Sequence, residues 1–463
     1  MNLKLPVIAS MVMTVLMLSS CLGTDENTIV YYNDTALTSF SLGTVKLIYH
    51  TTASDGSDST YTTTYTPSSN LFYIDQQQGL VYNPDSLPVN TNVEAVLATI
   101  NTKKSGVAVL ELKDREGKDS LVYYSSTDSI DFSKPVNVRV YNLSWTAYRT
   151  YTIRVNVHQQ SGTEFNWEKT TCSELSQVGM RRMVSTDQAT YLFGVENGAT
   201  VGFRLDNDTW TRLTSTTGLT ADAYKSITVK DNYLYILNNG SVLRSADGST
   251  WQTVGSASQL TQLLGASPYK LYAMGTEGLY ESADNGATWS RDNLDESTDL
   301  LPQDNISFIC KPSQVNADTY KLLLFGTRDG VTYTWSKVEE DESDAESAQP
   351  WSYYDVDKYN SHQLPKWDYE QVIWYDNSLL AIGGDFWQWY QSLDEGLVWD
   401  GETEEVNYYS LPGDFPKQSI QFTVTTDSDH YIYISRQGDK RVWKGRLART
   451  AWTEEQTVYT RSK

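Results

Sequence analysis

Ser282-Ala283-Asp284-Asn285-Gly286-Ala287-Thr288-Trp289 carries the residues of a tight β-hairpin followed by a large aromatic ring. Asn285 and Gly286 both tolerate the positive φ angles that a tight turn requires. The serine and aspartate side chains can hydrogen-bond to turn amides that have no strand partner. The indole of Trp289 is large enough to form a wedge between neighbouring sheets. The stretch therefore predicts a hairpin turn with an architectural role.

Two further stretches follow the same template. Ser392-Leu393-Asp394-Glu395-Gly396-Leu397-Val398-Trp399 has valine in place of threonine, and Ser245-Ala246-Asp247-Gly248-Ser249-Thr250-Trp251 is one residue shorter. The template resembles the Asp-box, the hairpin signature of sialidase-like and related β-propellers. That resemblance implies structural roles for Ser245, Asp247, Trp251, Ser282, Asp284, Gly286, Trp289, Ser392, Asp394, Gly396 and Trp399. Repeats of roughly 40 to 50 residues are typical of propeller blades.

Six β-rich runs recur through the carboxyl-terminal part of the chain, and we interpret each as the second strand of a blade. They are Tyr191–Val195, Tyr233–Leu237, Lys270–Met274, Lys321–Phe325, Ser378–Ile382 and Tyr431–Ser435. An apolar run precedes each one, and a third strand and a tryptophan-bearing fourth strand follow, at Trp210, Trp251, Trp289, Trp351, Trp399 and Trp452. This pattern predicts a six-bladed propeller over residues 165–463. Phe165-Asn166-Trp167-Glu168-Lys169 is an extra outer strand that could pair with the last blade and close the ring, which leaves seven blades as an alternative.

Residues 35–158 alternate short β-rich runs with turn residues. The clearest run places Tyr151, Ile153, Val155 and Val157 on one face and polar residues on the other, the period of a half-buried strand. About 120 residues of this kind predict a β-sandwich of immunoglobulin-like type. Residues 159–164 form a polar linker to the propeller, so the fold class predicted for the whole chain is all-β.

The front domain also resembles a known module. The order of short motifs matches the immunoglobulin-like modules of Bacteroidota-type surface lipoproteins, and the motifs are Thr38-Ser39-Phe40, Ile74-Asp75, Pro84-Asp85-Ser86-Leu87-Pro88-Val89, Asp131-Phe132-Ser133-Lys134-Pro135-Val136 and Tyr151-Thr152-Ile153-Arg154-Val155. Together with the propeller behind it, the chain resembles one family of such lipoproteins that is defined as a domain of unknown function. The resemblance implies an architecture and brings no activity with it.

The amino terminus predicts export and lipidation. Residues 1–20 hold one charged side chain, Lys4, before an apolar run, which is typical of a secretory signal peptide. Leu18-Ser19-Ser20-Cys21 resembles the bacterial lipobox, which implies a lipid on Cys21 and a tether over residues 21–34; an ordinary signal peptide with a chance cysteine is the alternative. Leu22 after the cysteine and the pair Asp25-Glu26 resemble the pattern of lipoproteins exported to the outer membrane and its outer surface. We therefore expect an outer-membrane lipoprotein that faces the cell exterior.

The composition of the chain argues against several classes of binding partner: nucleic acid, anionic lipid surfaces and metal ions. The formal net charge of −22 repels nucleic acid and anionic lipid surfaces, so neither is expected as a partner. Beyond Cys21 only Cys172 and Cys310 remain, and we expect them to be unpaired. Four scattered histidines give no metal-site spacing, and no cofactor or metal is predicted.

Long loops on a rigid scaffold are where binding usually resides. In propellers, the loops from a fourth strand to the next first strand share a face with the second-to-third loops, opposite the Asp-box hairpins. The long insertions Asn293–Asn305, Asp355–Glu370 and Glu402–Ser419 are of this kind. Trp387 and Trp389 are two apart on an expected strand and so should point the same way. The candidate ligand-binding residues are Trp367, Tyr369, Trp387, Trp389, Tyr408 and Lys417, with packing between blades as the alternative for these rings.

No catalytic residue is predicted. Sialidases need an arginine triad and open with an Arg-Ile-Pro motif, whereas this chain has Met180-Arg181-Arg182-Met183-Val184 at that place. Strand alternation would send only one of the two arginines into the central channel. The leading hypothesis is a non-catalytic, lipid-anchored envelope protein whose propeller face binds a polysaccharide or an envelope protein. A glycoside hydrolase or lyase, and a structural accessory of an outer-membrane assembly, are the alternatives.

Overall fold

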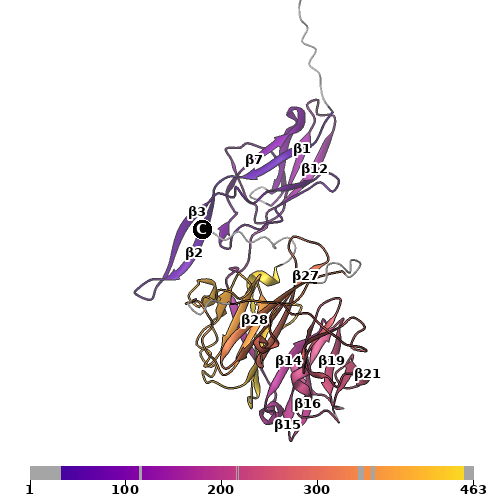
Figure 1. The fold of residues 1–463 in the computed structure, drawn as a ribbon. Coiled ribbons are helices and arrows are strands. Elements are labelled where there is room, and N and C mark those ends of the chain that lie inside the picture. The colour runs from indigo at the N-terminus through magenta and orange to yellow at the C-terminus, as the bar shows by residue number, and fades with distance from the viewer. Residues whose placement is uncertain are drawn as a thin grey trace, which may run out of the picture. The chain divides into compact units, whose positions relative to one another are not determined.

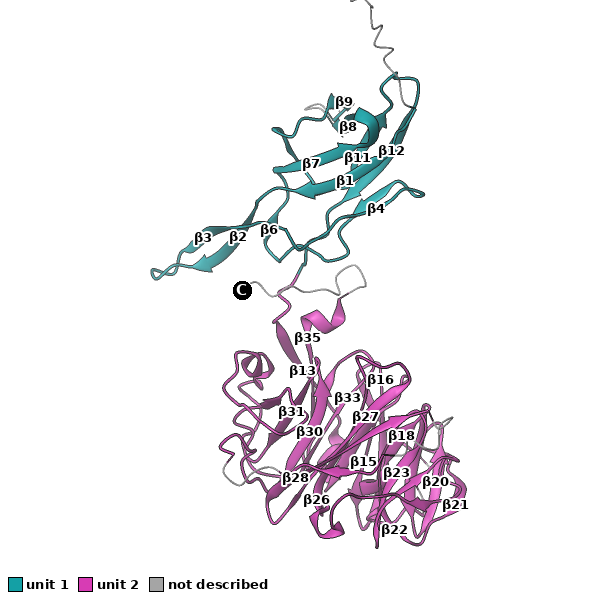
Figure 2. Ribbon diagram, turned by 45° about the horizontal axis from the view of Figure 1, so that its top comes forward, with its two compact units in different colours: residues 1–159, 454–463 teal, residues 160–453 magenta. Residues whose placement is uncertain are grey.

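Antiparallel β-strands dominate residues 33–113, 117–214, 216, 218–341, 349–355 and 360–452, which are the residues that this computed structural model describes. The chain divides into one unit of residues 1–159 with 454–463 and a second unit of residues 160–453 (Figure 2). The helices in the described residues are single 3-10 turns of five residues or fewer. The all-β prediction is therefore confirmed. None of the described helices has the length and apolar character needed to cross a membrane.

The first unit contains a β-sandwich. One sheet has the order β1–β7–β10, with β1 (Leu37–Leu42), β7 (Val96–Thr102) and β10 (Ser129–Ile130). The other has the order β4–β5–β12–β11–β8–β9, with β4 (Tyr73–Asp75), β5 (Leu80–Tyr82), β12 (Tyr148–Arg154), β11 (Val136–Tyr141), β8 (Val107–Lys113) and β9 (Asp119–Tyr123). Side chains from both sheets, among them Phe40, Ile100, Val138 and Ile153, form one buried core.

A third small sheet extends from this sandwich (Figure 1). Its order is β3–β2–β6, with β3 (Asp58–Tyr65), β2 (Val45–Thr52) and β6 (Thr91–Asn92). Most side chains of β3 are exposed, whereas the start of β2 reaches the common core through Val45 and Leu47. A 3-10 turn, η2 (Lys103–Ser105), follows β7.

The described residues of the second unit form six sheets, and the strands of each sheet run in the following order from the innermost strand outward. They are β14 (Arg181–Ser185), β15 (Thr190–Glu196), β16 (Ala199–Asp206), β17 (Thr209–Arg212); β18 (Thr228–Lys230), β19 (Tyr233–Asn238), β20 (Ser241–Ser245), β21 (Gln252–Ser256); β22 (Leu260–Ala266), β23 (Leu271–Gly275), β24 (Gly278–Ser282), β25 (Ser290–Arg291); β26 (Asp304–Pro312), β27 (Thr319–Arg328), β28 (Val331–Glu340), β29 (Ser352–Tyr353); β30 (Glu370–Tyr375), β31 (Ser378–Gly383), β32 (Tyr390–Ser392); and β33 (Phe422–Thr426), β34 (Ile432–Arg436), β35 (Arg441–Leu447), β13 (Phe165–Thr171). The 3-10 turns are η3 (Ser173–Gln177), η4 (Ala223–Ser226), η5 (Thr298–Leu300), η7 (Glu405–Tyr409) and η8 (Ala448–Ala451).

These sheets close into a ring. The innermost strands β14, β18, β22, β26, β30 and β33 contact one another in that order, and β33 contacts β14. Every buried cluster of this unit is shared by two successive sheets, and the one containing Phe203 and Tyr433 joins the first sheet to the last. The ring is completed by β13, which pairs along its whole length with β35. The second strands lie where the sequence predicts them, and the expected pairing of residues 165–169 with the last blade is confirmed.

The prediction of a final fourth strand at Trp452 is wrong. Trp452 follows η8 rather than lying in a strand, because β13 from the start of the unit already occupies the outer edge of the last sheet. The ring of Trp452 instead lies against Gly162, where an added Cβ would approach its Cη2 to 2.7 Å.

The three sequence-predicted hairpins share one hydrogen-bond pattern. In the first, Ser282 Oγ donates to Asp284 Oδ1 at 2.8 Å and accepts from Gly286 N at 2.8 Å. The Trp289 indole donates to the Gly286 carbonyl at 3.2 Å. The φ angles of Asn285 and Gly286 are 56° and 93°, as the turn requires. The equivalent serine, aspartate, glycine and tryptophan contacts recur at Ser245, Asp247, Gly248, Trp251, Ser392, Asp394, Gly396 and Trp399.

Candidate functional site

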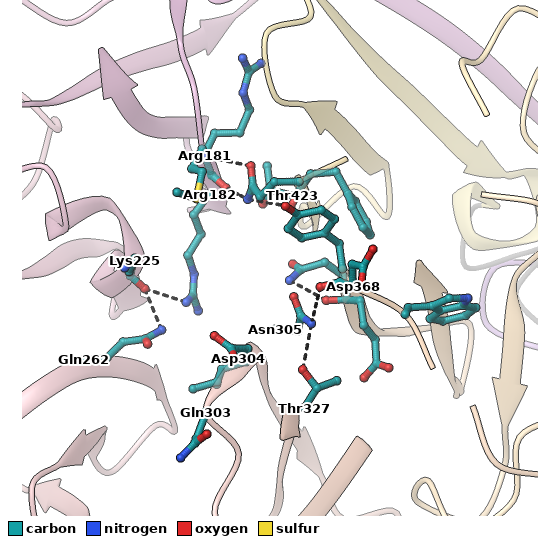
Figure 3. Close-up of a pocket in the computed structure, with 18 of the residues that line it drawn as sticks. Arg181, Arg182, Lys225, Gln262, Gln303, Asp304, Asn305, Thr327, Asp368 and Thr423 are labelled. Carbon is teal, nitrogen blue, oxygen red and sulfur yellow. Dashed lines mark hydrogen bonds between the residues drawn. The ribbon is translucent and has the colours of Figure 1, made fainter. Parts of the chain in front are cut away.

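A cavity of about 860 Å³ opens at the mouth of the central channel, where the innermost strands begin (Figure 3). The segments that line it precede or start β14, β26, β30 and β33, together with the β27–β28 turn at Asp329 and Gly330. It continues into a channel of about 400 Å³ lined by all six innermost strands. The three hairpins at residues 245–251, 282–289 and 392–399 each follow the third strand of a sheet. They therefore lie at the other end of the sheets from the cavity. The cavity is therefore on the loop-rich face.

Amide and carboxylate side chains form a large part of the cavity wall. Those from the starts of different sheets are Gln262, Gln303, Asp304, Asn305, Asp368, Glu370, Gln371 and Gln421, and Asp329 lies in the β27–β28 turn. Asn305 fixes part of this wall, because its Nδ2 donates to Thr327 Oγ1 at 2.9 Å and to the Asp368 carbonyl at 3.1 Å. Such groups offer paired donors and acceptors to a polar ligand. In the described residues, no group of three or more His, Cys, Asp or Glu side chains is placed to hold a metal ion.

Two adjacent arginines have opposite roles, as strand alternation predicts. The buried Arg181 side chain points away from the cavity and donates to Ser435 Oγ at 3.0 Å and to the carbonyls of Asp439 and Leu175 at 3.1 and 2.9 Å (Figure 3). It therefore ties the first sheet to the last. The Arg182 side chain points into the cavity, where Nη1 donates to the Lys225 carbonyl at 2.8 Å. Burial lowers the pKa of both guanidinium groups to about 10, so both remain charged near neutral pH.

Glu370 is a buried carboxyl at the edge of the cavity. It is 1% exposed, and its Oε2 accepts from Thr332 Oγ1 at 2.8 Å. Its Oε1 is buried and accepts no hydrogen bond from the described residues. Burial raises the pKa of Glu370 to about 7, because the charged form loses the solvation of water.

Two of the sequence-predicted ligand residues, Trp367 and Tyr369, line this cavity. The Trp367 ring lies directly over the backbone of Gly383 and Gly384, where an added Cβ would approach ring atoms to 2.4 and 2.5 Å. On another side it makes an edge contact with Tyr390, with ring centroids 5.5 Å apart. Only glycine allows this approach, so the glycine pair fixes the indole beside the cavity.

The expectation that Trp387 and Trp389 share a strand face is wrong. Residues 387–389 lie in the loop between β31 and β32, and Phe386 before them has a positive φ of 61°, which breaks the strand alternation. Trp389 is 1% exposed and packs in the core between the fifth and sixth sheets, so it cannot touch a ligand. Trp387 is 71% exposed, and Lys417 lies over its ring at 4.3 Å from the centroid. Neither Trp387 nor Lys417 lines the cavity.

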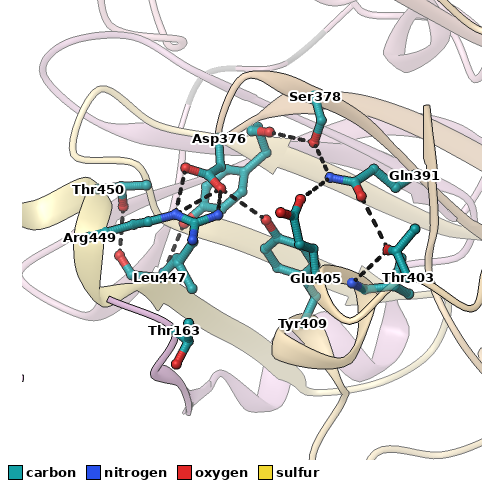
Figure 4. Close-up of polar contacts among 12 residues, drawn as sticks. Thr163, Asp376, Ser378, Gln391, Thr403, Glu405, Tyr409, Leu447, Arg449 and Thr450 are labelled. Carbon is teal, nitrogen blue, oxygen red and sulfur yellow. Dashed lines mark hydrogen bonds and ion pairs between the residues drawn. The ribbon is translucent and has the colours of Figure 1, made fainter. Parts of the chain in front are cut away.

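No residue of the insertion 402–419 lines the cavity, so the placement of Tyr408 there is wrong. The contacts around the neighbouring Tyr409 are shown in Figure 4. The neighbouring Tyr409 hydroxyl donates to Asp376 at 3.4 Å. Asp376 follows the end of β30, whereas the cavity lies at its beginning. Arg449 bonds the same aspartate and lies 5.9 Å from the Tyr408 ring centroid, so this part of the insertion covers the outer edge of the sheets.

Most of the cavity wall could not be predicted from the sequence. Beyond the expectation that one of Arg181 and Arg182 points inward, Asp304, Asn305 and Glu370 are polar residues of two different repeats, and no spacing connects the repeats. The available signal was positional, because each lies at or beside the first residue of an innermost strand. Cys21 and the signal sequence lie outside the described residues. The described cysteines Cys172 and Cys310 are unpaired, as predicted.

Both units match family models. Residues 161–455 match the model described as the DUF6242 beta propeller domain, and residues 40–155 match the N-terminal domain of the domain of unknown function DUF6242. No curated protein is similar enough to count as a match.

Several solved structures are similar to part of the chain at low identity. Virginiamycin B lyase from Staphylococcus aureus is 9% identical, with 61% of this chain and 100% of that chain covered and a TM-score of 0.35. A Trichoderma reesei enzyme of carbohydrate-active family AA12 is 10% identical, with coverage of 61% and 96% and a TM-score of 0.37. A thermostable family-43 glycoside hydrolase is 11% identical, with coverage of 58% and 88% and a TM-score of 0.24. Likeness at this level says nothing about the activity of this chain.

Proposed function

The chain belongs to the DUF6242 family. From the geometry of the cavity and the pattern of the amino terminus we propose that it is a non-catalytic, lipid-anchored envelope protein that binds a glycan. The anchor in this proposal is the lipid on Cys21, which places the protein at the outer membrane, facing the cell exterior. The binding site is the cavity at the mouth of the propeller.

One observation carries the glycan proposal: an indole held at the edge of a cavity whose wall includes many amide and carboxylate side chains. Sugars present hydroxyl groups around their rims and C–H groups on their faces. Gln303, Asn305 and Asp368 can satisfy hydroxyl groups, while Trp367 and Tyr369 offer aromatic surface for a sugar face. A cavity of about 860 Å³ also lies within the usual range of ligand sites.

A glycan array followed by titration calorimetry tests this proposal. Trp367→Ala should weaken binding of any retained glycan at least tenfold, because the stacking surface is lost. Trp387→Ala is the matched comparison, since that ring is exposed but does not line the cavity, and it should change affinity much less. Gln303→Ala removes an exposed side chain of the wall, so it tests the same site with a substitution that should not disturb folding, in case Trp367→Ala does.

Retention of no glycan, or retention that neither Trp367→Ala nor Gln303→Ala weakens, would contradict the glycan proposal. The anchor is tested separately by feeding cells a labelled fatty acid. The wild-type chain should carry the label and Cys21→Ser should not.

A glycoside hydrolase or lyase is the second candidate, and the exposed carboxylates of the cavity favour it. Asp304 and Asp368 are exposed and line the same cavity, so either could contact a substrate as a general acid or base. Incubation with each retained glycan, followed by product analysis, separates the two functions. Release of shorter glycans that Asp304→Asn or Asp368→Asn abolishes would establish the enzyme.

A further inference from the structure

Arg182 spans the mouth of the cavity from the first sheet. Its Nη1 donates to the carbonyl of Lys225 in η4, and its Nη2 donates to the carbonyl of Leu264 in β22 at 3.2 Å. Gln262 Nε2 donates to the same Lys225 carbonyl at 3.0 Å, which helps hold that acceptor in place (Figure 3). The guanidinium is therefore fixed in one position in the cavity before any ligand arrives.

The charge of this guanidinium has no counter-ion in the described part of the chain. No described carboxylate lies within 4.0 Å of it, and both of its hydrogen-bond partners are uncharged carbonyls. The neighbouring Lys225 ammonium pairs with Asp222 at 2.9 Å, so it does not supply a second free charge. Burial without a carboxylate partner also accounts for the lowered pKa of Arg182.

A structural role explains Arg181 but not Arg182. The Arg181 side chain is 1% exposed and its bonds reach the last sheet, whereas the Arg182 side chain points into the cavity (Figure 3). A guanidinium has five N–H donors in a planar fork, and two carbonyls leave several of them for a ligand. An oxyanion is the ligand that matches both this geometry and the missing negative charge.

We propose that Arg182 binds the anionic substituent, a carboxylate or a sulfate, of an acidic sugar in this cavity. This inference rests on the proposed function and specifies its ligand class. The aromatic ring of Trp367 and the amides of the wall then contact the uncharged part of the same glycan. The chain as a whole has a net charge of −22, so long-range electrostatics oppose an acidic glycan. The exposed carboxylates of Asp304 and Asp368 in the same wall also oppose it, so any preference for the acidic form must arise from direct contact with Arg182.

The test compares oligosaccharides that differ only in charge. Immobilised pairs of uronate glycans with their carboxyl-reduced forms, and of sulfated glycans with their desulfated forms, are probed with the full chain at about 150 mM salt, where the Debye length is about 8 Å. We expect the wild-type protein to prefer the charged member of at least one pair by about tenfold to a hundredfold, as expected for hydrogen bonds to a charged group. Arg182→Gln should abolish that preference while keeping the neutral member bound. Arg182→Lys should keep part of the preference for the charged member, because lysine supplies the positive charge but not the planar set of N–H donors.

Lys366→Gln is the matched control, since it removes one exposed positive charge from the same face without changing the cavity wall. Equal retention of charged and neutral members, or a preference that Arg182→Gln leaves intact, would overturn the acidic-sugar inference and leave glycan binding standing. Retention of no member of any pair would overturn both. A preference for sulfated over uronate pairs, lost in Arg182→Gln, identifies the anion as sulfate.

Discussion

A glutamate occupies a left-handed turn position in the hairpin of residues 392–399. Glu395 has a φ of 66°, which asparagine or glycine tolerates better than glutamate. Its carboxylate accepts from the Tyr354 hydroxyl at 2.7 Å and pairs with Lys321 at 3.0 Å and Lys311 at 3.5 Å. These contacts to the fourth sheet offset the backbone strain, so the hairpin joins two sheets as well as turning the chain.

Gly396→Ala should lower the free energy of unfolding more than Gly198→Ala does. Both glycines have positive φ angles, +94° and +82°, so both substitutions carry the same backbone strain. Only at Gly396 does the new Cβ collide with a neighbour, approaching Phe325 Cε1 to 2.5 Å, whereas nothing lies within 4 Å at Gly198. We expect a difference of about 1–3 kcal/mol in urea unfolding, typical of overpacking. Equal losses would mean that the hairpin does not press against the fourth sheet.

Glu370 should make the stability of the protein fall as pH rises. Its pKa is about 7 in the folded state and 4.5 as the ordinary value, so between these values the folded state binds more protons than the unfolded state. The free energy of unfolding therefore decreases through this window. Glu370→Gln should match the wild type near pH 4 and be more stable at pH 8, by about 2–3 kcal/mol. Glu402→Gln, at an exposed carboxyl, is the control; the same pH dependence in wild type and Glu370→Gln would contradict the account.

At the scale of elements, the ring is closed by the contacts between the first and last sheets, which we call the seam. Strand β13 pairs with β35, and Gln421 joins the start of β33 to β14 by exchanging hydrogen bonds with the Arg181 backbone at 3.0 and 2.8 Å. The side chain of Arg181 adds bonds to Ser435 and to the Asp439 carbonyl. Together with the buried cluster that contains Phe203 and Tyr433, these contacts close the ring.

Arg181→Met should therefore cost about 3 kcal/mol or more in the free energy of unfolding. The substitution keeps an apolar stem of similar length but leaves the buried acceptors of Leu175, Ser435 and Asp439 without their donor. Arg291→Gln is the control, because Arg291 is half-exposed and lies 4.0 Å from Glu277. Urea unfolding followed by tryptophan fluorescence measures both. A loss below about 1 kcal/mol in Arg181→Met would show that the seam is held by the strands alone.

Across the whole molecule, repetition made the fold predictable and the site only partly so. The second strands and the closing strand followed from period and alternation, because every sheet must bury the same faces against its neighbours. The loop at residues 386–389 did not, since the positive φ at Phe386 breaks the alternation, so that Trp389 is buried and Trp387 is exposed. Glu339 shows the same limit. Runs of acidic residues usually lie in solvent, yet Glu339, the first residue of such a run, is 4% exposed on β28 and accepts from the Tyr272 hydroxyl at 2.5 Å.

The cavity itself depends on contacts between repeats that are distant in sequence. Trp367 and Tyr369 could be predicted because aromatic residues are unusual in a polar insertion. The partners of Arg182 come from two later sheets, so its position in the mouth becomes evident only when the ring is closed. Alternation showed that one of the two arginines would point inward, but not which one.

Hydrogen–deuterium exchange with a bound glycan tests the central claim most directly, namely that the mouth formed by the starts of the innermost strands is the binding site. The account predicts slower exchange on ligand addition in segments 303–306 and 367–371, with turns at the opposite end of the sheets, such as Asp376-Asn377, unchanged. Protection confined to those opposite turns or to the first unit would contradict it.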